Sequence, residues 1–297
     1  KFPRLFEMNL SNNLIETIDS DDLFTHFPKM STLKISKNFI SKLNENSFKG
    51  LNILKYLDLS SNQILSVEED TFSSLAELDS LIVARNRIRK LPAELLVKNK
   101  LKSINFSHNE LESLDIDILR DQINLQEIDF SSNNLGNLSW TALLSDTVNL
   151  KSINLAYNQI SAFEIDSILL FDRVTLVSLK GNKLRRVEKD HFKQLPNLVI
   201  LHLSENQIEF VDKEAFKENR QLEVLDLSDN KLNDASFTEN LVLTSILMLK
   251  NNRIKKFDLS LINKAKILDL SMNKIERIES NRLIECLNQI LFETLNI

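Results

Sequence analysis

The chain has 297 residues, of which 42% are hydrophobic and 27% are charged, a balance that is typical of a folded chain with a core. Only three glycines and one cysteine occur, which excludes a glycine-rich phosphate loop, an internal disulfide framework and a zinc site of several cysteines. The four histidines leave little for metal chemistry, and the net charge of −5 argues against a dedicated nucleic-acid-binding protein.

Asparagine recurs along the whole chain at intervals of 21 to 25 residues. Each of these asparagines is the ninth residue of the frame LxxLxLxxNxL, as in the segment from Leu54 to Ile64. A fixed period of this length indicates a repeat architecture, because a single turn buries its leucines only against its neighbours. The recurring residues are Asn13, Asn38, Asn62, Asn86, Asn109, Asn133, Asn158, Asn182, Asn206, Asn230, Asn252 and Asn273.

A second apolar row lies ten residues after these asparagines and predicts the core of the opposite, convex half of each turn. In the first repeat the apolar residue falls one place later, at Phe24, and Asn240 interrupts the row in the tenth repeat. The row consists of Phe48, Phe72, Leu96, Leu119, Leu143, Ile168, Phe192, Phe216, Ile262 and Leu283.

The leucines, asparagines and convex phenylalanines resemble the leucine-rich repeat family over essentially the whole chain. The period of about 24 residues is similar to the typical subclass, which is common in extracellular proteins such as Toll-like receptor ectodomains, small leucine-rich proteoglycans and insect immune proteins. The resemblance implies an α/β solenoid, a curved horseshoe with a parallel β-sheet on its concave face. We expect one such domain over residues 1–297, with about 12–13 repeats and no cysteine caps, that stops inside a last repeat marked by Phe292, Leu295 and Ile297.

Within each repeat, the alternation of buried and outward residues predicts a short strand, as in Leu57-Asp58-Leu59. Parallel strands of successive repeats stack about 4.8 Å apart, so twelve repeats are expected to span roughly 55 Å. The amide of the ninth-position asparagine both donates and accepts hydrogen bonds, so we expect it to satisfy backbone groups and to link neighbouring repeats. We therefore predict that Asn158→Ala destabilises the fold more than a change at the exposed Gln159.

The concave strand face is the expected binding surface. The fifth and eighth positions of the frame present polar and charged side chains there, and Tyr, Met and Arg among them are types that are enriched at interfaces. The alternative interpretation is that each is a solvated strand residue without a partner. The predicted binding residues are Lys34, Tyr56, Asp58, Arg85, His108, Asp129, Tyr157, His202, Asp226, Lys250 and Asp269.

One row of the fifth position has the residue types of a catalytic triad. Ser178, His202 and Asp226 stand at the same frame position in three successive repeats, so neighbours are expected about 4.8 Å apart. An open concave sheet offers neither an oxyanion hole nor a buried acid, and an enzyme is therefore the least favoured interpretation.

Basic residues gather late in the chain, and such a charge run is usually an ordinary solvated face. Lys250 and Lys266 are expected on the concave side and the others on flanking loops. The alternative is that they bind an anionic partner such as a sulfated glycan or an acidic protein patch. The basic residues are Lys250, Arg253, Lys255, Lys256, Lys264, Lys266, Lys274 and Arg277, and an acidic stretch with Glu16, Asp19, Asp21 and Asp22 lies in the first repeat.

Three N-glycosylation sequons begin at Asn9, Asn105 and Asn137, and chance alone explains that number in a chain this rich in asparagine and serine. A glycan on Asn105 would block the centre of the concave face and direct a partner to a flank or an end. Cys286 falls near the convex leucines and is interpreted as a buried thiol, or alternatively as half of a disulfide whose partner lies outside this sequence.

These features favour a non-enzymatic recognition scaffold that binds a protein ligand or co-receptor and uses no cofactor, metal or nucleic acid. The resemblance implies an extracellular or cell-surface setting in innate immunity, adhesion or receptor signalling. The last repeats are shortened, and Thr244 and Ala265 replace leucine there; we interpret this as sequence drift, with a binding region or a homo- or heterodimer contact as the alternative. The alternative function is a cytoplasmic scaffolding or regulatory protein, for which a lone cysteine is natural.

Overall fold

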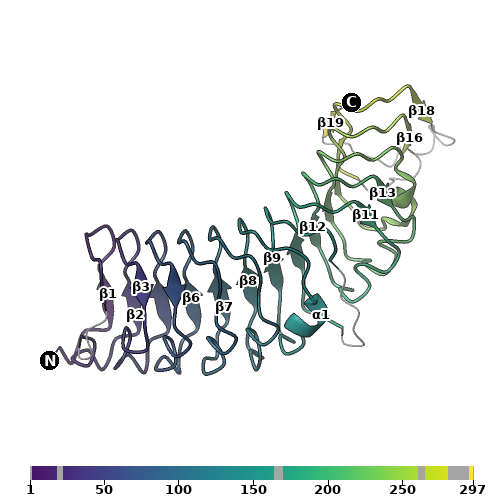
Figure 1. Cartoon of the computed structure of the whole chain (residues 1–297). Helices are drawn as coiled ribbons and strands as arrows, with labels where there is room; N and C mark the ends of the chain where they lie inside the picture. Colours follow the sequence, from purple (N-terminus) through teal and green to yellow (C-terminus); the bar gives the residue numbers. More distant parts are fainter. Residues whose placement is uncertain (1, 19–22, 164–169, 260–264, 280–293, 297) are drawn as a thin grey trace. The chain divides into compact units, whose positions relative to one another are not determined.

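The computed structural model describes residues 2–18, 23–163, 170–259, 265–279 and 294–296. Contacts divide the chain into two compact units, residues 1–150 and 151–297, which we call unit 1 and unit 2. In each unit, successive short strands pair in parallel and form a ladder on one face, while turns form the opposite face (Figure 1). The predicted parallel-strand solenoid is confirmed, whereas its continuity as one domain stays a prediction.

The inner strands carry three residues each, and from β2 to β17 the middle residue is the buried fourth residue of the frame. The ladder of unit 1 contains β1 (Glu7–Asn9), β2 (Thr32–Lys34), β4 (Tyr56–Asp58), β6 (Ser80–Ile82), β7 (Ser103–Asn105) and β8 (Glu127–Asp129). The ladder of unit 2 contains β9 (Ser152–Asn154), β10 (Leu176–Ser178), β12 (Ile200–His202), β14 (Val224–Asp226), β15 (Ile246–Met248), β17 (Ile267–Asp269) and β19 (Thr294–Asn296). The pairing of β19 with β17 places a strand where the thirteenth repeat is expected.

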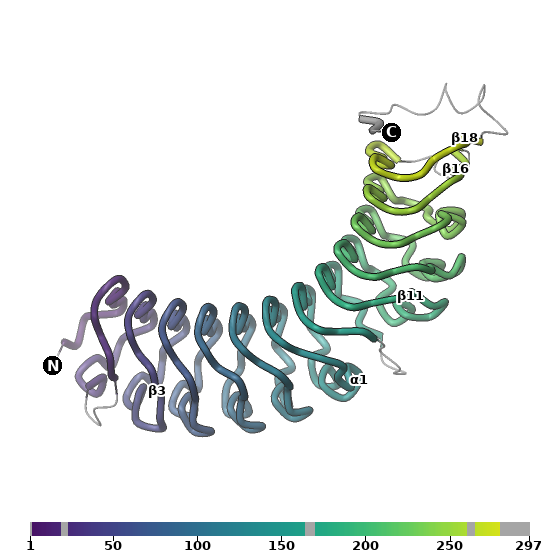
Figure 2. Tube along the Cα trace, turned by 45° about the horizontal axis from the view of Figure 1, so that its top comes forward, coloured from purple at the N-terminus to yellow at the C-terminus, as the bar shows by residue number. Residues whose placement is uncertain are grey.

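The opposite faces of the turns contain little regular structure. Figure 2 shows successive turns of each unit lying side by side, each repeating the path of the one before. Three short parallel pairs and two short helical segments occur among the described residues there. They are β3 (Lys42–Leu43) with β5 (Ser66–Val67), β11 (Arg186–Val187) with β13 (Phe210–Val211), β16 (Lys256–Asp258) with β18 (Arg277–Glu279), α1 (Trp140–Leu143) and the 3₁₀ segment η1 (Ser236–Asn240).

The ninth-position asparagines link neighbouring turns, as predicted. Asn62 is buried, and its Nδ2 donates to the carbonyl oxygen of Leu59 in its own turn at 3.0 Å and of Ile35 in the preceding turn at 3.0 Å. Its Oδ1 accepts the backbone N–H of Ile40 at 3.1 Å. The same three bonds recur at Asn86, Asn109, Asn133, Asn182, Asn206, Asn230, Asn252 and Asn273.

The eighth residue of the frame adopts the left-handed backbone conformation in every one of these turns, a feature that the sequence analysis does not anticipate. In Lys37, for example, φ is +54°, and the backbone N–H donates to the carbonyl of Ser60 in the next turn at 2.9 Å. A residue other than glycine pays roughly 1 kcal/mol or more for this conformation, and the inter-turn hydrogen bond holds it there. The other eighth-position residues are Asn12, Ser61, Arg85, His108, Ser132, Tyr157, Gly181, Glu205, Asp229, Asn251 and Met272.

The second apolar row fills the opposite half of each turn. Phe48 lies between Phe24 and Phe72, with ring centroids 6.5 and 5.8 Å apart. Where the row is interrupted in unit 2, Phe237 of η1 takes the vacant place and meets Phe216 edge to face at 6.0 Å. The described members of the row are buried, which confirms the prediction.

A second set of buried amides lies beneath the outer turns. Asn99 Nδ2 donates to the carbonyls of Phe72 and Leu75, and Asn219 makes the equivalent pair of bonds in unit 2. At the start of the eleventh repeat, the hydroxyl of Thr244 donates to the carbonyl of Leu222 at 2.9 Å, which explains how a polar residue is accommodated at a leucine position. Predictions that fall outside the described residues concern Asp19, Asp21, Asp22, Ile168, Ile262, Lys264, Leu283, Cys286, Phe292 and Ile297.

Candidate functional site

The outward columns of the strand ladders form the strand face of each unit. Because the strands pair in parallel and in register, equivalent side chains of successive turns lie one above the other. Each inner strand begins at the third position of the frame and ends at the fifth, so these two columns flank the buried fourth position. The eighth position lies three residues after the end of the strand, in the same repeat.

The third-position column of unit 2 is aliphatic over five neighbouring strands. Leu176 pairs with Ile200, Ile200 with Val224, Val224 with Ile246, and Ile246 with Ile267. All five are half-buried, whereas the fourth-position residues beside them are fully buried. We call these five residues the aliphatic stripe. These five residues are not among the predicted binding residues, although the third position of the same frame reveals them directly in the sequence.

The third-position column of unit 1 is polar and carries Glu7, Thr32, Tyr56, Ser80, Ser103 and Glu127. Lys34 Nζ lies 2.9 Å from Glu7 Oε1 and 6.0 Å from the ring centroid of Tyr56. The hydrogen bond that Lys34 donates to Glu7 raises the pKa of Lys34, and burial, followed by the charge of Asp58, raises the pKa of Tyr56. Lys34, Tyr56 and Asp58 are therefore brought together as predicted.

Carboxylates at the fifth position hold the turn that follows each strand. Asp58 Oδ1 accepts the backbone N–H of Ser60 at 2.9 Å, and Asp226 Oδ1 accepts that of Ser228 at 2.9 Å. The same bond recurs at Asn9, Asn105, Asp129, Asn154 and Asp269. One oxygen of each side chain thus serves the fold, which leaves less capacity for a partner than the sequence analysis assumed.

Tyr157, Lys180 and Glu205 form a charged cluster at the first turns of unit 2. Lys180 Nζ lies 3.0 Å from Glu205 Oε1 and 5.7 Å from the centroid of the exposed Tyr157 ring. Glu205, and after it Tyr157, raises the pKa of Lys180 by hydrogen bonding. The Tyr157 ring occupies the space that a Cβ at Gly181 would need, so glycine at that position lets the ring lie flat against the next turn.

Ser178, His202 and Asp226 lie in register on β10, β12 and β14, as predicted. Within the described part of the chain these three side chains make no hydrogen bond with one another, and Asp226 is engaged by its own turn. The row therefore has the order of a triad without its hydrogen bonds.

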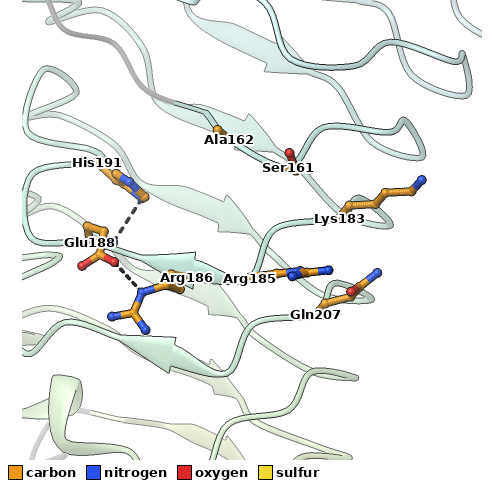
Figure 3. A pocket seen from close by; sticks show the side chains of 8 residues that line it. All are labelled: Ser161, Ala162, Lys183, Arg185, Arg186, Glu188, His191 and Gln207. Atoms are coloured by element: carbon orange, nitrogen blue, oxygen red, sulfur yellow. Dashed lines mark hydrogen bonds and ion pairs between the residues drawn. The ribbon is translucent and has the colours of Figure 1, made fainter.

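We call the ninth-position asparagines the ladder asparagines. One flank of unit 2 carries the residues that stand one and three places after each ladder asparagine. Cations dominate there, and a hollow of about 450 Å³ opens at one end. Figure 3 shows Lys183, Arg185 and Gln207 pointing to one side, with Arg186 and Glu188 turned to the other. We call the following six residues the cationic flank: Lys183, Arg185, Lys231, Arg253, Lys255 and Lys274.

The predicted binding residues divide by exposure. Asp269 is only 7% exposed, and its Oδ1 accepts both the backbone N–H and the hydroxyl of Ser271, so its carboxylate supports the turn. The others are exposed or half-buried, and their role as binding residues stays a prediction. They are Lys34, Tyr56, Asp58, Arg85, His108, Asp129, Tyr157, His202, Asp226 and Lys250.

The three sequons differ in accessibility. Asn9 and Asn137 are exposed, whereas Asn105 is half-buried and its Oδ1 accepts both the N–H and the hydroxyl of Ser107. Over the ranges that the structure describes, no group of three or more His, Cys, Asp and Glu side chains is placed to hold a metal ion. The same ranges contain no helix with the length and apolarity needed to cross a bilayer.

Two family models match the chain. One, a leucine-rich repeat model, matches residues 28–88 and 172–232, and the other, for a BspA-type leucine-rich repeat region, matches residues 62–169. The chain is 31% identical to chaoptin of Drosophila melanogaster over 134 residues, which are 45% of this chain and 10% of chaoptin. It is 30% identical to mouse (Mus musculus) epiphycan over 159 residues, 52% of this chain and 47% of epiphycan, and 33% identical to human lumican over 148 residues, 46% and 41%. The chain thus spans less than half the length of each of these three relatives.

Solved structures agree with the fold. A leucine-rich repeat protein of Leptospira interrogans is 27% identical, with a TM-score of 0.81 over 93% of this chain and 68% of that one. A chain from the Drosophila Toll–Spatzle complex is 21% identical, with a TM-score of 0.70 over 93% of this chain and 45% of that one. The asparagine ladders, the stacked parallel strands and these matches together show that the chain belongs to the leucine-rich repeat family, a family of scaffolds for protein interaction, and resembles Toll-like receptor ectodomains.

Proposed function

We propose that this chain is a non-catalytic recognition domain of an extracellular or cell-surface protein, with a receptor-like, innate-immune or adhesive role, and that a protein partner binds the strand face of unit 2. The aliphatic stripe carries the proposal. Side chains at these positions lie on an outward face and are only half-buried, so part of their apolar surface stays open to solvent and is not used by the core of the turns. Contiguous exposed apolar surface with a polar border is characteristic of interaction sites.

The neighbours of the aliphatic stripe support a protein partner. The adjoining fifth-position column provides the polar residues Ser178, His202 and Asp226, followed by the apolar Met248. Most of the third column thus borders polar groups in the next one. Protein interfaces share this arrangement of an apolar centre and a polar rim. Covering roughly 200 Å² of apolar surface would contribute roughly 5 kcal/mol, before the costs of association are subtracted. The hydrogen-bonded ladder keeps the ordering cost on this side low because its backbone is already fixed.

The comparisons support the kind of partner and setting. The 24-residue repeats resemble a subclass that is common in extracellular proteins, and structurally similar proteins include chains of a Toll–Spatzle complex and of a LRIM1/APL1C complex. A protein ligand, a co-receptor or a second leucine-rich repeat chain in a homo- or heterodimer fits these examples. The alternative, an intracellular scaffold, is supported by the 32% identity over 137 residues to mouse leucine-rich repeat serine/threonine-protein kinase 1, of which the chain covers 7%.

The proposal excludes catalysis by the row of Ser178, His202 and Asp226. A nucleophilic serine requires a base within hydrogen-bond reach and a base that is oriented by its acid. Asp226 instead accepts the N–H of Ser228 at 2.9 Å. A fluorophosphonate probe is expected to leave the chain unlabelled, and labelling that disappears in Ser178→Ala would contradict this part of the proposal.

Site-specific crosslinking tests the proposed face. With photoreactive p-benzoylphenylalanine in place of Ile246, the full chain should crosslink to a discrete protein from the extracellular fluid or cell surfaces of its source, and Val224→Asp should abolish that product. The matched control places the same probe at Glu218, an exposed residue on an outer turn of unit 2. Equal products from both positions, or a product that Val224→Asp leaves unchanged, would count against the strand face.

Mass spectrometry of protein from the native source tests the setting. An N-glycan on the exposed Asn137 is expected for an extracellular protein, with Asn105 less occupied because it is half-buried and hydrogen-bonded. Protein without any glycan at the three sequons, recovered from the cytosol, would favour the intracellular alternative.

A further inference from the structure

The cationic flank of unit 2 is built by the same repeat that builds its strand ladder. The residue after each ladder asparagine donates its backbone N–H to a carbonyl of the preceding turn, as Lys231 does to Ile208 at 2.8 Å and Arg253 to Leu232 at 2.8 Å. Lys274 is fixed in the same way. These side chains therefore project from equivalent points of successive turns and form a column along the unit.

A second column runs beside the first, two residues further along each turn. It carries Arg185 and Lys255, and the backbone N–H of Glu209 donates to the carbonyl of Arg185 at 2.9 Å, which stacks this column as well. Glu209 and Glu276 are the acidic residues of the two columns, and the remaining members are the neutral Gln159, Ser161, Gln207 and Asn233. Positive charge is thus in clear excess along this flank, although the whole chain has a net charge of −5.

Most of this positive charge is not neutralised locally. Lys231 lies 3.9 Å from Glu209 in an exposed and weak ion pair. The other five cations are exposed and form no ion pair with any residue that the structure describes. Like charges held side by side on a fixed scaffold repel one another, and a bound polyanion relieves that repulsion and releases its counterions.

We propose that the cationic flank binds a linear sulfated polysaccharide, a further site distinct from the proposed protein-binding strand face. Five successive turns at about 4.8 Å spacing place the cations along a track of roughly 19 Å, which suits an extended chain with several sulfate groups. Flexible lysine and arginine side chains match irregularly spaced sulfates because each reaches its own anion. At one end, Lys183 and Arg185 also line the hollow of about 450 Å³, where a sugar ring can lie between them (Figure 3).

The chemistry of the flank favours a sulfated glycan over single-stranded RNA. Proteins that bind single strands combine positive charge with aromatic side chains on which bases stack. Neither column contains an aromatic residue, and the nearby Phe210 ring is covered by the Arg186 guanidinium at 4.3 Å. The flank therefore offers charge without a stacking platform.

Binding to immobilised heparin, measured by surface plasmon resonance with the full chain, tests the proposal. The triple variant Lys183→Gln, Arg253→Gln, Lys274→Gln should weaken heparin binding at least tenfold at 150 mM salt and reduce the dependence of the logarithm of the affinity on the logarithm of the salt concentration. The matched control Lys49→Gln, Lys90→Gln, Lys100→Gln removes the same charge from exposed positions of unit 1 and should change the affinity less than twofold. Thermal melts of both variants should match that of the native chain, because all six side chains are exposed.

Three results would overturn the proposal. Equal weakening by both triple variants would show an effect of net charge rather than of the flank. Absence of heparin binding by the native chain at 150 mM salt would remove the site altogether. Tighter binding to a single-stranded RNA homopolymer than to heparin at equal salt would assign the flank to a nucleic acid instead. Loss of binding to desulfated heparin is the result expected if the sulfates make the contacts.

Discussion

Unit 1 and unit 2 share one frame but use its outward positions differently. The third-position column is polar in unit 1, where Glu7 and Lys34 form an ion pair, and aliphatic over five strands in unit 2. The flank shows the opposite trend. The equivalent flank of unit 1 consists of the residues one and three places after each ladder asparagine, and its first three turns expose Leu14, Phe39 and Leu65. In unit 2 the flank is cationic.

This difference separates the positions that hold the fold from those that are free to vary. The frame leucines and the ladder asparagines make the same contacts in both units, so replacing one of them should destabilise the fold in either unit. Third-position residues of the aliphatic stripe are only half-buried, and most residues of the cationic flank are exposed, so their character is less constrained by the core. Substitution of a ladder asparagine should therefore have the same effect on stability in both units. Substitution of a third-position or flank residue should have different effects on binding in the two units.

Removal of a ladder asparagine is expected to have the largest effect, and an equal one in both units. Asn86→Ala in unit 1 and Asn206→Ala in unit 2 each delete four hydrogen bonds and leave buried backbone groups without partners, which costs about 3 kcal/mol. Urea unfolding followed by circular dichroism measures the change. Asn13→Ala is the control, because Asn13 is exposed and its amide bonds only its own turn.

Asn158→Ala and Gln159→Ala provide the comparison within one turn. Asn158 is buried and Gln159 is exposed, so the first change should destabilise the chain and the second should not. Equal unfolding midpoints for these two variants would show that Asn158 does not hold its turn. A large loss of stability for Asn86→Ala and none for Asn206→Ala, or the reverse, would show that the two units do not share the frame.

The sequence predicts the frame well because its signals are local and repeated. The ladder asparagines, the fourth-position leucines and the convex phenylalanines each recur at a fixed offset, and the structure places them as expected. The left-handed eighth position escapes prediction because its residue types range from Lys37 to Met272 and share no signature. Its conformation follows from the inter-turn hydrogen bond and not from the side chain.

The less regular features escape for a different reason. Asn99 and Asn219 each stand 13 residues after a ladder asparagine and bond carbonyls of the preceding turn, but most other repeats carry a different residue at that offset, so the pair does not stand out in the sequence. Asp58 and Asp269 look like free acids in the sequence, yet backbone N–H groups two residues later use their oxygens. The aliphatic stripe, in contrast, is readable from the third position once the strand is known to begin there.

Charge placed in the third-position column should have the second largest effect, and only in unit 2. Val224→Asp in the aliphatic stripe is expected to weaken binding of the crosslinked protein partner roughly 30-fold, about 2 kcal/mol, because a carboxylate is desolvated against an apolar surface. Ser103→Asp, at the same frame position in unit 1, should leave the affinity unchanged. Isothermal titration with the partner measures both, and equal losses would assign binding to the whole strand face.

Replacement of the one glycine at the eighth position should have a smaller effect on stability. Gly181→Ala adds a Cβ at a φ of +67°, where it meets the Tyr157 ring, and is expected to cost about 1 kcal/mol or more. In a Tyr157→Ala background the cost should fall to the backbone component alone. A double-mutant cycle in urea measures the difference, and a cycle without coupling would show that the ring does not rest on Gly181.

The smallest effects are expected at the two clusters of lysine, glutamate and tyrosine that lie on the strand faces. Lys34 with Glu7 in unit 1 and Lys180 with Glu205 in unit 2 both have a lysine pKa raised above 10.5 by the carboxylate. A lysine with a raised pKa contributes stability at every pH below its unfolded value, and that contribution is lost as the pH rises through the folded value. Glu7→Gln and Glu205→Gln should therefore each lower the pKa of the partner lysine toward 10.5, and each should approach the native chain in stability only above that pH.

The two clusters differ in what surrounds the lysine, and this difference orders the expected shifts. After Glu205, Tyr157 is the next cause that raises the pKa of Lys180, whereas for Lys34 the charges of Tyr56 and Asp58 come last among the causes and only Glu7 contributes strongly. The pKa of Lys34 should thus fall closer to its ordinary value than that of Lys180. Titration of ¹⁵N-labelled lysine side chains by NMR measures both. A larger fall at Lys180 would mean that the Tyr157 hydroxyl does not bind the ammonium group, and that the two clusters are equivalent ion pairs despite their different neighbours.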